Sequence, residues 1–158
     1  MGWLELKAGL KGLTSLTFVE YPGIDTGSNY YLEMAETQLK EYFAGRRRDF
    51  AIPLDPEGTE FDKLTWNAVK NIGFGVSTSY SRIARQIGSP SAGRAVGSAN
   101  GRNPIAIFIP CHRVVAENGN LTGYSGGLKR KRWLLDWEKR DSEPKLFNSH
   151  SLGNSLYK

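Results

Sequence analysis

The chain has 158 residues, of which 39% are hydrophobic and 23% charged, and Lys and Arg outnumber Asp and Glu by 21 to 16. This composition is typical of a globular protein with one large domain or two small ones. No apolar run approaches the roughly 20 residues of a membrane span and no secretory signal is visible, which argues against the membrane and secreted classes. We therefore expect a cytoplasmic protein, or a nuclear one in a host with a nucleus.

Residues 1–58 predict a small N-terminal α/β domain. Residues 15–19 have the composition of a strand, and residues 30–44 predict a helix because apolar side chains recur there at helical spacing. These side chains are Leu32, Ala35, Leu39 and Phe43. This part of the chain carries no motif with a recognisable chemistry, so we expect it to serve as a scaffold.

A linker is predicted at residues 52–58, which contain two prolines, a glycine and two acids. A second domain then covers residues 59–158 and begins with a helix that ends at Gly73. Thr59 and Asp62 have the spacing of a capping box, with Asp in place of the usual Glu. The apolar face of this helix is predicted to contain Phe61, Leu64, Ala68 and Ile72.

Two short helices, at residues 79–87 and 92–99, flank a turn at Gly88–Pro90 and predict a helix-turn-helix. The second helix is small-sided around Arg94, with Ala92, Gly93, Ala95 and Gly97 among its residues. Glycine weakens a helix by roughly 1 kcal/mol relative to alanine, which suggests that something approaches this backbone closely. Tight helix packing and DNA are the two explanations, and the basic surroundings favour DNA.

The stretch 63–116 contains seven Lys and Arg residues and no Asp or Glu. The positive electrostatic field of such a stretch favours binding of nucleic-acid phosphates, and an ordinary basic surface is the alternative. Residues 105–109 predict a buried strand or extended run halted by Pro110, and residues 128–140 predict the last helix. Four basic residues at its start, Lys129, Arg130, Lys131 and Arg132, would contact phosphate or form a solvated face.

These elements predict an α+β fold: a small N-terminal α/β scaffold domain followed by a mostly helical, winged-helix-like C-terminal domain that contains the helix-turn-helix. The tail from about residue 141 is polar and has no strong pattern.

The most informative stretch is Pro110–Val114, which contains the single cysteine of the chain, Cys111, next to His112. A free thiol has a pKa of about 8.5, and a nearby imidazole and basic groups favour the nucleophilic thiolate. A sharp turn after Pro110 would bring the two side chains together, because neighbours on a strand point in opposite directions. A small buried cysteine beside an unrelated histidine is the alternative.

Hydrolytic cysteine enzymes usually take their histidine from a distant part of the sequence. The only other histidine is His150, in the polar tail, which argues against a papain-like protease. What remains is chemistry in which Cys111 attacks once and nothing hydrolyses the product.

This motif and its surroundings resemble the O6-alkylguanine-DNA alkyltransferase family. The matching blocks stand at the family's spacing and are Arg94–Gly97, Asn103–Pro104, Pro110–Val114, Gly123–Leu128 and Trp133–Leu135. The resemblance implies DNA repair in which O6-alkylguanine, and less readily O4-alkylthymine, is flipped out of double-stranded DNA. The alkyl group would pass irreversibly to Cys111, so that one monomer repairs one lesion as a single-turnover methylated-DNA–protein-cysteine methyltransferase. Cooperative binding along DNA stays open.

The resemblance assigns catalytic roles to five residues. Cys111 would accept the alkyl group, His112 would act as a water-mediated base, and Glu138 would orient His112. Tyr80 would donate a proton toward the leaving guanine, and Asn103 would brace the turn before the active-site segment. Glu138 also falls on the apolar face of the last predicted helix, where a buried carboxylate needs a partner; an exposed Glu is the alternative.

The resemblance also assigns contacts with DNA and with the flipped base. Arg94 would fill the space that the base leaves, Tyr124 would wall the pocket, and the backbone of Ser125 and Val114 would contact the base. The remaining DNA contacts would come from Ala92, Gly93, Ala95 and Arg102. A solvated Arg94 and a plain glycine-rich turn at residues 124–125 are the alternatives.

No metal or other cofactor is expected, because one cysteine and two histidines cannot complete a four-ligand zinc site without carboxylates. The zinc-binding residues of some family members are missing, and Ala106 stands where some relatives carry proline, which leaves tolerance for bulky adducts open. Two other readings remain. One is a damage-binding relative without transfer activity, although such relatives lack the acceptor cysteine, and the other is a sequence-specific regulator that uses the helix-turn-helix alone.

Overall fold

The computed structural model describes residues 2–142, so the polar tail predicted from about residue 141 lies almost entirely outside the described residues. The elements in chain order are β1 (Trp3–Ala8), β2 (Leu13–Val19), α1 (Tyr30–Phe43), α2 (Glu60–Lys70), β3 (Thr78–Ser79), α3 (Tyr80–Gln86), α4 (Gly93–Gly101), the 3₁₀ turn η1 (Cys111–Arg113), β4 (Val114–Val115) and α5 (Leu128–Ser142). None of the helices within residues 2–142 is long and apolar enough to cross a membrane.

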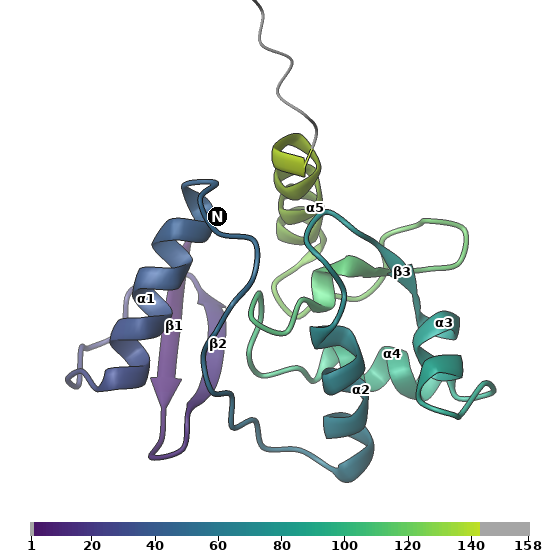
Figure 1. Ribbon diagram of the computed structural model, residues 1–158, viewed down its shortest axis with the longest axis horizontal. Coiled ribbons are helices and arrows are strands. Elements are labelled where there is room, and N and C mark those ends of the chain that lie inside the picture. Colours follow the sequence, from purple (N-terminus) through teal and green to yellow (C-terminus); the bar gives the residue numbers. More distant parts are fainter. Residues whose placement is uncertain (1, 143–158) are drawn as a thin grey trace, which may run out of the picture.

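The N-terminal part is an antiparallel hairpin of β1 and β2 with α1 against one face (Figure 1). The strand predicted at residues 15–19 is confirmed within β2, whereas β1 was not predicted. The predicted helix is confirmed as α1, which Asn29 caps by accepting from the Leu32 N–H at 3.0 Å. Its buried side chains are Ala35, Gln38, Leu39 and Tyr42.

The capping box at the start of α2 is confirmed in both directions: the Thr59 hydroxyl accepts from the Asp62 N–H at 3.1 Å, and the Asp62 carboxylate accepts from the Thr59 N–H at 3.1 Å. The predicted apolar face is partly wrong, because Leu64 is exposed and Trp66 is buried. Trp66 turns inward because its indole N–H finds an acceptor there, the Ala99 carbonyl at 2.8 Å.

The helix-turn-helix consists of α3 and α4, which pack against each other and against α2 (Figure 1). Gly88 makes the turn after α3 with φ of 75°, a conformation that glycine adopts without strain. β3 immediately precedes α3 and pairs in parallel with β4, just after η1. The predicted α+β fold with a mostly helical C-terminal part is confirmed.

The strand predicted at residues 105–109 is wrong, although the segment is buried as expected. Ile105 forms a single bridge with Leu16 of β2, and the chain then turns back so that Ala106 bridges to Ile109. Ile107 has φ of 70°, and the Phe108 N–H donates to the Ala106 carbonyl at 2.8 Å. A residue with positive φ ends the extended run.

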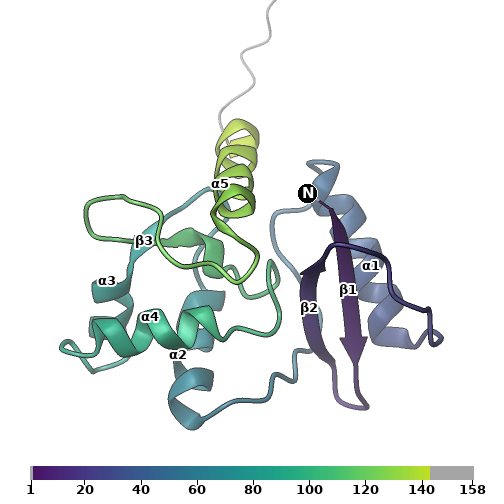
Figure 2. The same ribbon diagram turned by 180° about the vertical axis from the view of Figure 1, so that it is seen from behind.

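The two halves of the chain meet along the free edge of β2, as Figure 2 shows from behind. The Leu16 N–H donates to the Pro104 carbonyl at 2.9 Å, and the Ala106 N–H donates to the Leu16 carbonyl at 3.1 Å. At the other end of β2, Leu13 exchanges two hydrogen bonds with the linker segment at Pro53 and Asp55. The predicted linker thus runs along the hairpin.

Candidate active site

A short 3₁₀ turn places the Cys111 and His112 side chains, as the sharp turn predicted after Pro110 requires. The Cys111 N–H donates to the Ile109 carbonyl at 2.7 Å, and the Arg113 N–H donates to the Pro110 carbonyl at 2.9 Å. The turn takes these neighbours out of strand geometry, so their side chains need not point to opposite faces. Cys111, His112 and Arg113 are all buried.

Asn103 holds the approach to this turn. Its side-chain amide donates to the Ile109 carbonyl at 2.8 Å, and its side-chain oxygen accepts from the Ile105 N–H at 3.0 Å. The two bonds bridge the ends of the 105–109 turn and so place Pro110 and Cys111. This is the bracing position predicted for Asn103.

The Cys111 thiol is only 1% exposed. Burial raises the pKa of Cys111 to about 11, and a hydrogen bond from Asn103 and the positive charge of Lys131 oppose that shift only in part. The resting sulfur is therefore a neutral thiol. Burial thus outweighs the effect of the neighbouring basic groups on the pKa of Cys111, and a thiolate requires a base that takes the proton.

His112 is fully buried, and its Nε2 lies 2.8 Å from Glu138 Oε1. Because the carboxylate only accepts, Nε2 carries the proton and Nδ1 is the unprotonated nitrogen. Nδ1 is buried and has no hydrogen-bond partner in the described part of the protein. Burial lowers the pKa of His112 and Glu138 opposes this, so the ring is neutral near pH 7 and Nδ1 is a free base.

Glu138 is the centre of the buried network. Its Oε1 accepts from Tyr42 Oη at 2.7 Å, His112 Nε2 at 2.8 Å and Arg113 Nη2 at 2.9 Å. Its Oε2 accepts from Arg113 Nε at 2.9 Å and the Gly75 N–H at 3.1 Å. Burial alone would raise the pKa of Glu138, but the hydrogen bonds from His112 and Arg113 outweigh it and hold that pKa well below its usual range. Glu138 is therefore an orienting carboxylate and not a proton acceptor.

Two members of this network, Tyr42 and Arg113, were not predicted from the sequence, and neither was the burial of Lys131. Arg113 belongs to the basic stretch 63–116, but it is buried, with Nη1 donating to the Ile72 carbonyl at 2.5 Å. Lys131 had been assigned to phosphate contact or to solvent, yet it is fully buried. A signal for Lys131 existed, because it precedes the buried Leu134 and Glu138 by three and seven residues and so shares their helical face.

Lys131 places a positive charge near the Cys111 thiol and connects the end of the 3₁₀ turn with the loop before α5. Its Nζ donates to the Val114 carbonyl at 2.6 Å, to the Thr122 carbonyl at 2.8 Å and to Tyr80 Oη at 3.5 Å. Burial lowers the pKa of Lys131 to about 8, and Cys111 opposes this shift. The Val114 carbonyl, which is predicted to contact the base, thus already accepts one hydrogen bond from Lys131. Its second lone pair can still accept a hydrogen bond from the base.

Tyr80 begins α3 at the mouth of a cavity of about 560 Å³, which is in the range of small-molecule sites. The lining includes Tyr80, Arg94, Gly97, Glu117 and Thr122. Cys111 is not part of this lining. The cavity therefore does not reach the sulfur, and the Thr122 carbonyl on its lining accepts hydrogen bonds from Tyr80 and Lys131.

The loop before α5 lies against the N-terminal hairpin. The Tyr124 ring is 6.2 Å from the Phe18 ring, and its hydroxyl is buried without a partner among the described residues. A Cβ at Gly126 would lie 2.6 Å from Phe18 and 2.7 Å from Tyr124, so glycine is required there. Ser125, predicted to contact the base through its backbone, is exposed beside Tyr124.

The outer face of α4 is open. Arg94 and Ala95 are exposed, Ala92 and Gly93 are half-buried, and a Cβ at Gly93 would meet no atom within 4 Å. Protein packing among the described residues therefore does not explain Gly93. Arg102, also predicted to contact DNA, donates to Asp62 at 2.6 Å and to Ser98 at 2.8 Å.

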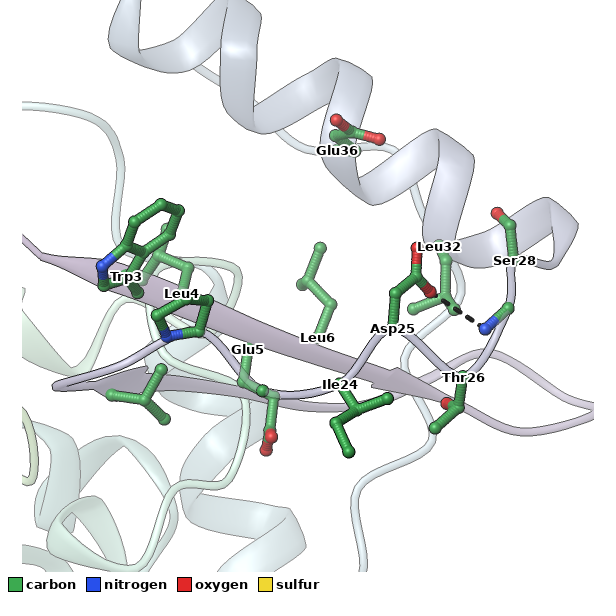
Figure 3. Close-up of a pocket in the computed structure, with 14 residues that line it drawn as sticks. Trp3, Leu4, Glu5, Leu6, Ile24, Asp25, Thr26, Ser28, Leu32 and Glu36 are labelled. Atoms are coloured by element: carbon green, nitrogen blue, oxygen red, sulfur yellow. Dashed lines mark hydrogen bonds between the residues drawn. The ribbon is translucent and has the colours of Figure 1, made fainter.

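A separate hollow of about 420 Å³ lies in the N-terminal part, where Figure 3 shows the loop that carries Ile24 and Asp25 beside β1 and beneath α1. Its lining comes entirely from residues 3–36 and includes no cysteine or histidine. Among residues 2–142, no group of three His, Cys, Asp and Glu side chains could hold a metal ion.

Comparisons with known proteins match both halves of the chain. Residues 60–140 match the family described as 6-O-methylguanine DNA methyltransferase, DNA binding domain, and residues 1–56 match the ribonuclease-like domain of the same description. The methylated-DNA--protein-cysteine methyltransferase of Methanosarcina acetivorans is 50% identical over 120 residues, which are 76% of this chain and 77% of that protein.

Solved structures have the same fold. Mycobacterium tuberculosis O6-methylguanine methyltransferase is 44% identical and superposes with a TM-score of 0.81, covering 92% of this chain and 91% of that chain. A crystal structure of Mycobacterium tuberculosis OGT in complex with DNA is also 44% identical, with a TM-score of 0.78 and 87% of each chain covered.

Proposed function

Because the chain belongs to the 6-O-methylguanine DNA methyltransferase family, we propose that it repairs DNA by transferring the alkyl group of O6-alkylguanine, and less readily of O4-alkylthymine, to Cys111. The observation that carries this function is the buried Cys111, next to a neutral His112 that Glu138 orients at 2.8 Å. The thioether product is stable, so one protein molecule repairs one lesion. The partner is double-stranded DNA that contains alkylated bases.

The reaction moves one proton and one alkyl group. The thiol proton of Cys111 passes through a water molecule to His112 Nδ1, which leaves a thiolate and an imidazolium beside the Glu138 carboxylate. The sulfur attacks the alkyl carbon, the carbon–O6 bond breaks, and its electron pair stays on guanine. Tyr80 donates its hydroxyl proton to guanine as this charge develops, and the proton held by the His112 imidazolium then replaces it. The net change is one proton from the thiol to guanine, and both side chains end neutral.

The base must leave the stack, because its alkyl carbon is out of reach inside the duplex. Unstacking costs a few kcal/mol, which Arg94 offsets by entering the gap. Arg94 is exposed on the open face of α4, where Ala92, Gly93 and Ala95 let the DNA backbone approach. The residues that cover Cys111 then have to shift to admit the base, because the sulfur is only 1% exposed.

The biological setting follows from the same proposal. We assign residues 1–58 to a scaffold domain and residues 59–158 to the domain that binds DNA and carries the acceptor. The protein acts as a monomer in the cytoplasm, or in the nucleus of a host that has one.

Intact-protein mass spectrometry tests the function directly. Mixed with an excess of duplex that carries one O6-methylguanine, the protein should gain the mass of one methyl group and no more, and the modified peptide should contain Cys111. Unmodified duplex should leave the mass unchanged. Continued demethylation beyond one lesion per protein would contradict the proposal, and tight lesion binding without a mass gain would favour the damage-binding reading.

Arg94→Ala tests base extrusion. We expect the transfer rate on duplex to fall roughly 10- to 100-fold, because a few kcal/mol of unstacking is no longer offset, while affinity for unmodified DNA falls only a few-fold. Arg85→Ala is the matched control, since it removes an exposed cation from α3 without touching α4. Single-turnover rates and binding titrations measure both. Equal losses of rate and affinity in the two variants would reduce Arg94 to an ordinary phosphate contact, and a footprint at one unmodified sequence would favour a regulator.

A further inference from the structure

Tyr42 is the one fully buried tyrosine among residues 2–142, and it comes from α1, in the part of the chain that carries no motif. Its ring lies in an aromatic cluster, with centroids 5.0 Å from Phe43, 5.4 Å from Phe50 and 5.9 Å from Phe74. The cluster fixes the ring, so the hydroxyl has a defined direction. Phenylalanine would pack in the same way, and the hydroxyl adds a polar function to this apolar site.

The Tyr42 hydroxyl donates to Glu138 Oε1 at 2.7 Å, across a sequence separation of 96 residues. The same oxygen accepts from His112 Nε2 at 2.8 Å, so tyrosine and imidazole share one acceptor atom. Burial raises the pKa of Tyr42, and Glu138 raises it further, so the hydroxyl is protonated and donates at neutral pH.

We propose that Tyr42 is a positioning residue for alkyl transfer, through which the N-terminal part of the chain orients the Glu138–His112 pair and weakens the pull of Glu138 on the His112 proton. A carboxylate oxygen that already accepts a hydrogen bond from Tyr42 is a weaker acceptor for the His112 N–H and stabilises the imidazolium less. His112 then stays neutral more readily and its Nδ1 remains free to take the thiol proton. This inference rests on the proposed function of His112 as the base.

Other ionisable groups also face the pair and must stay constant in a test. They come from η1, from the loop before α5 and from α5 itself, and they are Cys111, Arg113, Tyr124 and Lys131. Of these four residues, only Arg113 also donates to Glu138 Oε1, through Nη2. Its Nε donates to Oε2 and so holds the guanidinium in place. Tyr42→Phe therefore changes one bond and leaves these charges in place.

The test compares the pH dependence of transfer in wild-type protein, Tyr42→Phe and Phe43→Leu. Single-turnover methyl transfer should fall at low pH as His112 becomes protonated. In Tyr42→Phe the acid limb should move to higher pH, with a rate at the acid end roughly 3- to 10-fold below wild type. Phe43→Leu loses aromatic packing from the same helix but keeps the hydroxyl, and its acid limb should stay at the wild-type position.

A second readout requires no DNA. The chain has two histidines, so a ¹⁵N NMR titration of selectively labelled imidazoles, with His150→Gln to remove one signal, reports on His112 directly. The His112 transition should move to higher pH in Tyr42→Phe. An unmoved transition and an unmoved acid limb, in wild-type protein that transfers methyl normally, would overturn the role of Tyr42 alone. Absence of transfer by the wild type at every pH would instead overturn the proposed function.

Discussion

Cys111→Ser should abolish alkyl transfer completely while lesion binding persists. The serine hydroxyl fits the space of the thiol, but it is a far weaker nucleophile at neutral pH, and His112 cannot activate it enough for attack on an alkyl carbon. Mass spectrometry after incubation with O6-methylguanine duplex should show no added methyl group. Affinity for the lesion duplex should stay within a few-fold of wild type, because Arg94 and the open face of α4 are unchanged.

A competition experiment between Cys111→Ser and wild-type protein provides the control for this variant. Excess Cys111→Ser should slow repair by wild-type protein, since it occupies lesions that it cannot correct. Any transfer of methyl by Cys111→Ser to another residue would show that the acceptor had been misassigned. Loss of lesion binding together with loss of transfer would mean that the thiol itself contributes to recognition.

Glu138→Gln should destabilise the protein more than any other single change in the site. The carboxylate is the counter-charge of the buried Arg113 and accepts from it at 2.9 Å through both oxygens. Removing one partner of a buried ion pair typically costs about 3–5 kcal/mol, because the other charge is left uncompensated. We therefore expect the free energy of unfolding in urea to fall by about that amount, and transfer to be lost with it because His112 loses its orienting acceptor. Glu36→Gln is a control, since this glutamate forms only an exposed ion pair with Lys40.

The stability of the wild type should also depend on pH in a defined direction. The pKa of Glu138 is lower in the folded protein than in the unfolded chain, where it is about 4.3. The stabilisation that Glu138 provides is therefore complete above that unfolded value and is lost as the pH falls through the folded one. Glu138→Gln should show a weaker acid dependence of unfolding than wild type between neutral pH and pH 3. Parallel curves for the two proteins would contradict the assignment.

Features set by near neighbours in the sequence could be predicted. The capping box at Thr59 involves two residues three positions apart, and the turn at Gly88 requires a left-handed backbone that glycine supplies. The Pro110–Val114 motif and the blocks around it located the acceptor and its histidine, because their spacing is specific. The same local information placed α1, α3, α4 and α5 within a few residues.

Features set by distant partners could not be predicted. Residues 105–109 are all apolar, and the point at which this run pairs with the rest of the protein is set by Leu16 of β2, which is far away in the sequence. Burial of Lys131 depends on carbonyl acceptors from Val114 and Thr122, and burial of Tyr42 depends on Glu138. A cation or hydroxyl is recognisable as buried only once its partners are known, since alone it favours water.

Burial of a neutral sulfur affects how long the protein stays active before it meets damage. Every molecule is consumed by its first alkylation, so any side reaction with peroxide, a metabolite or a free alkylating agent wastes repair capacity. Oxidants and soft electrophiles attack exposed thiolates, and Cys111 presents neither exposure nor charge at rest. The burial that slows the intrinsic chemistry of this cysteine thus reserves it for a base that the protein has already extracted from DNA.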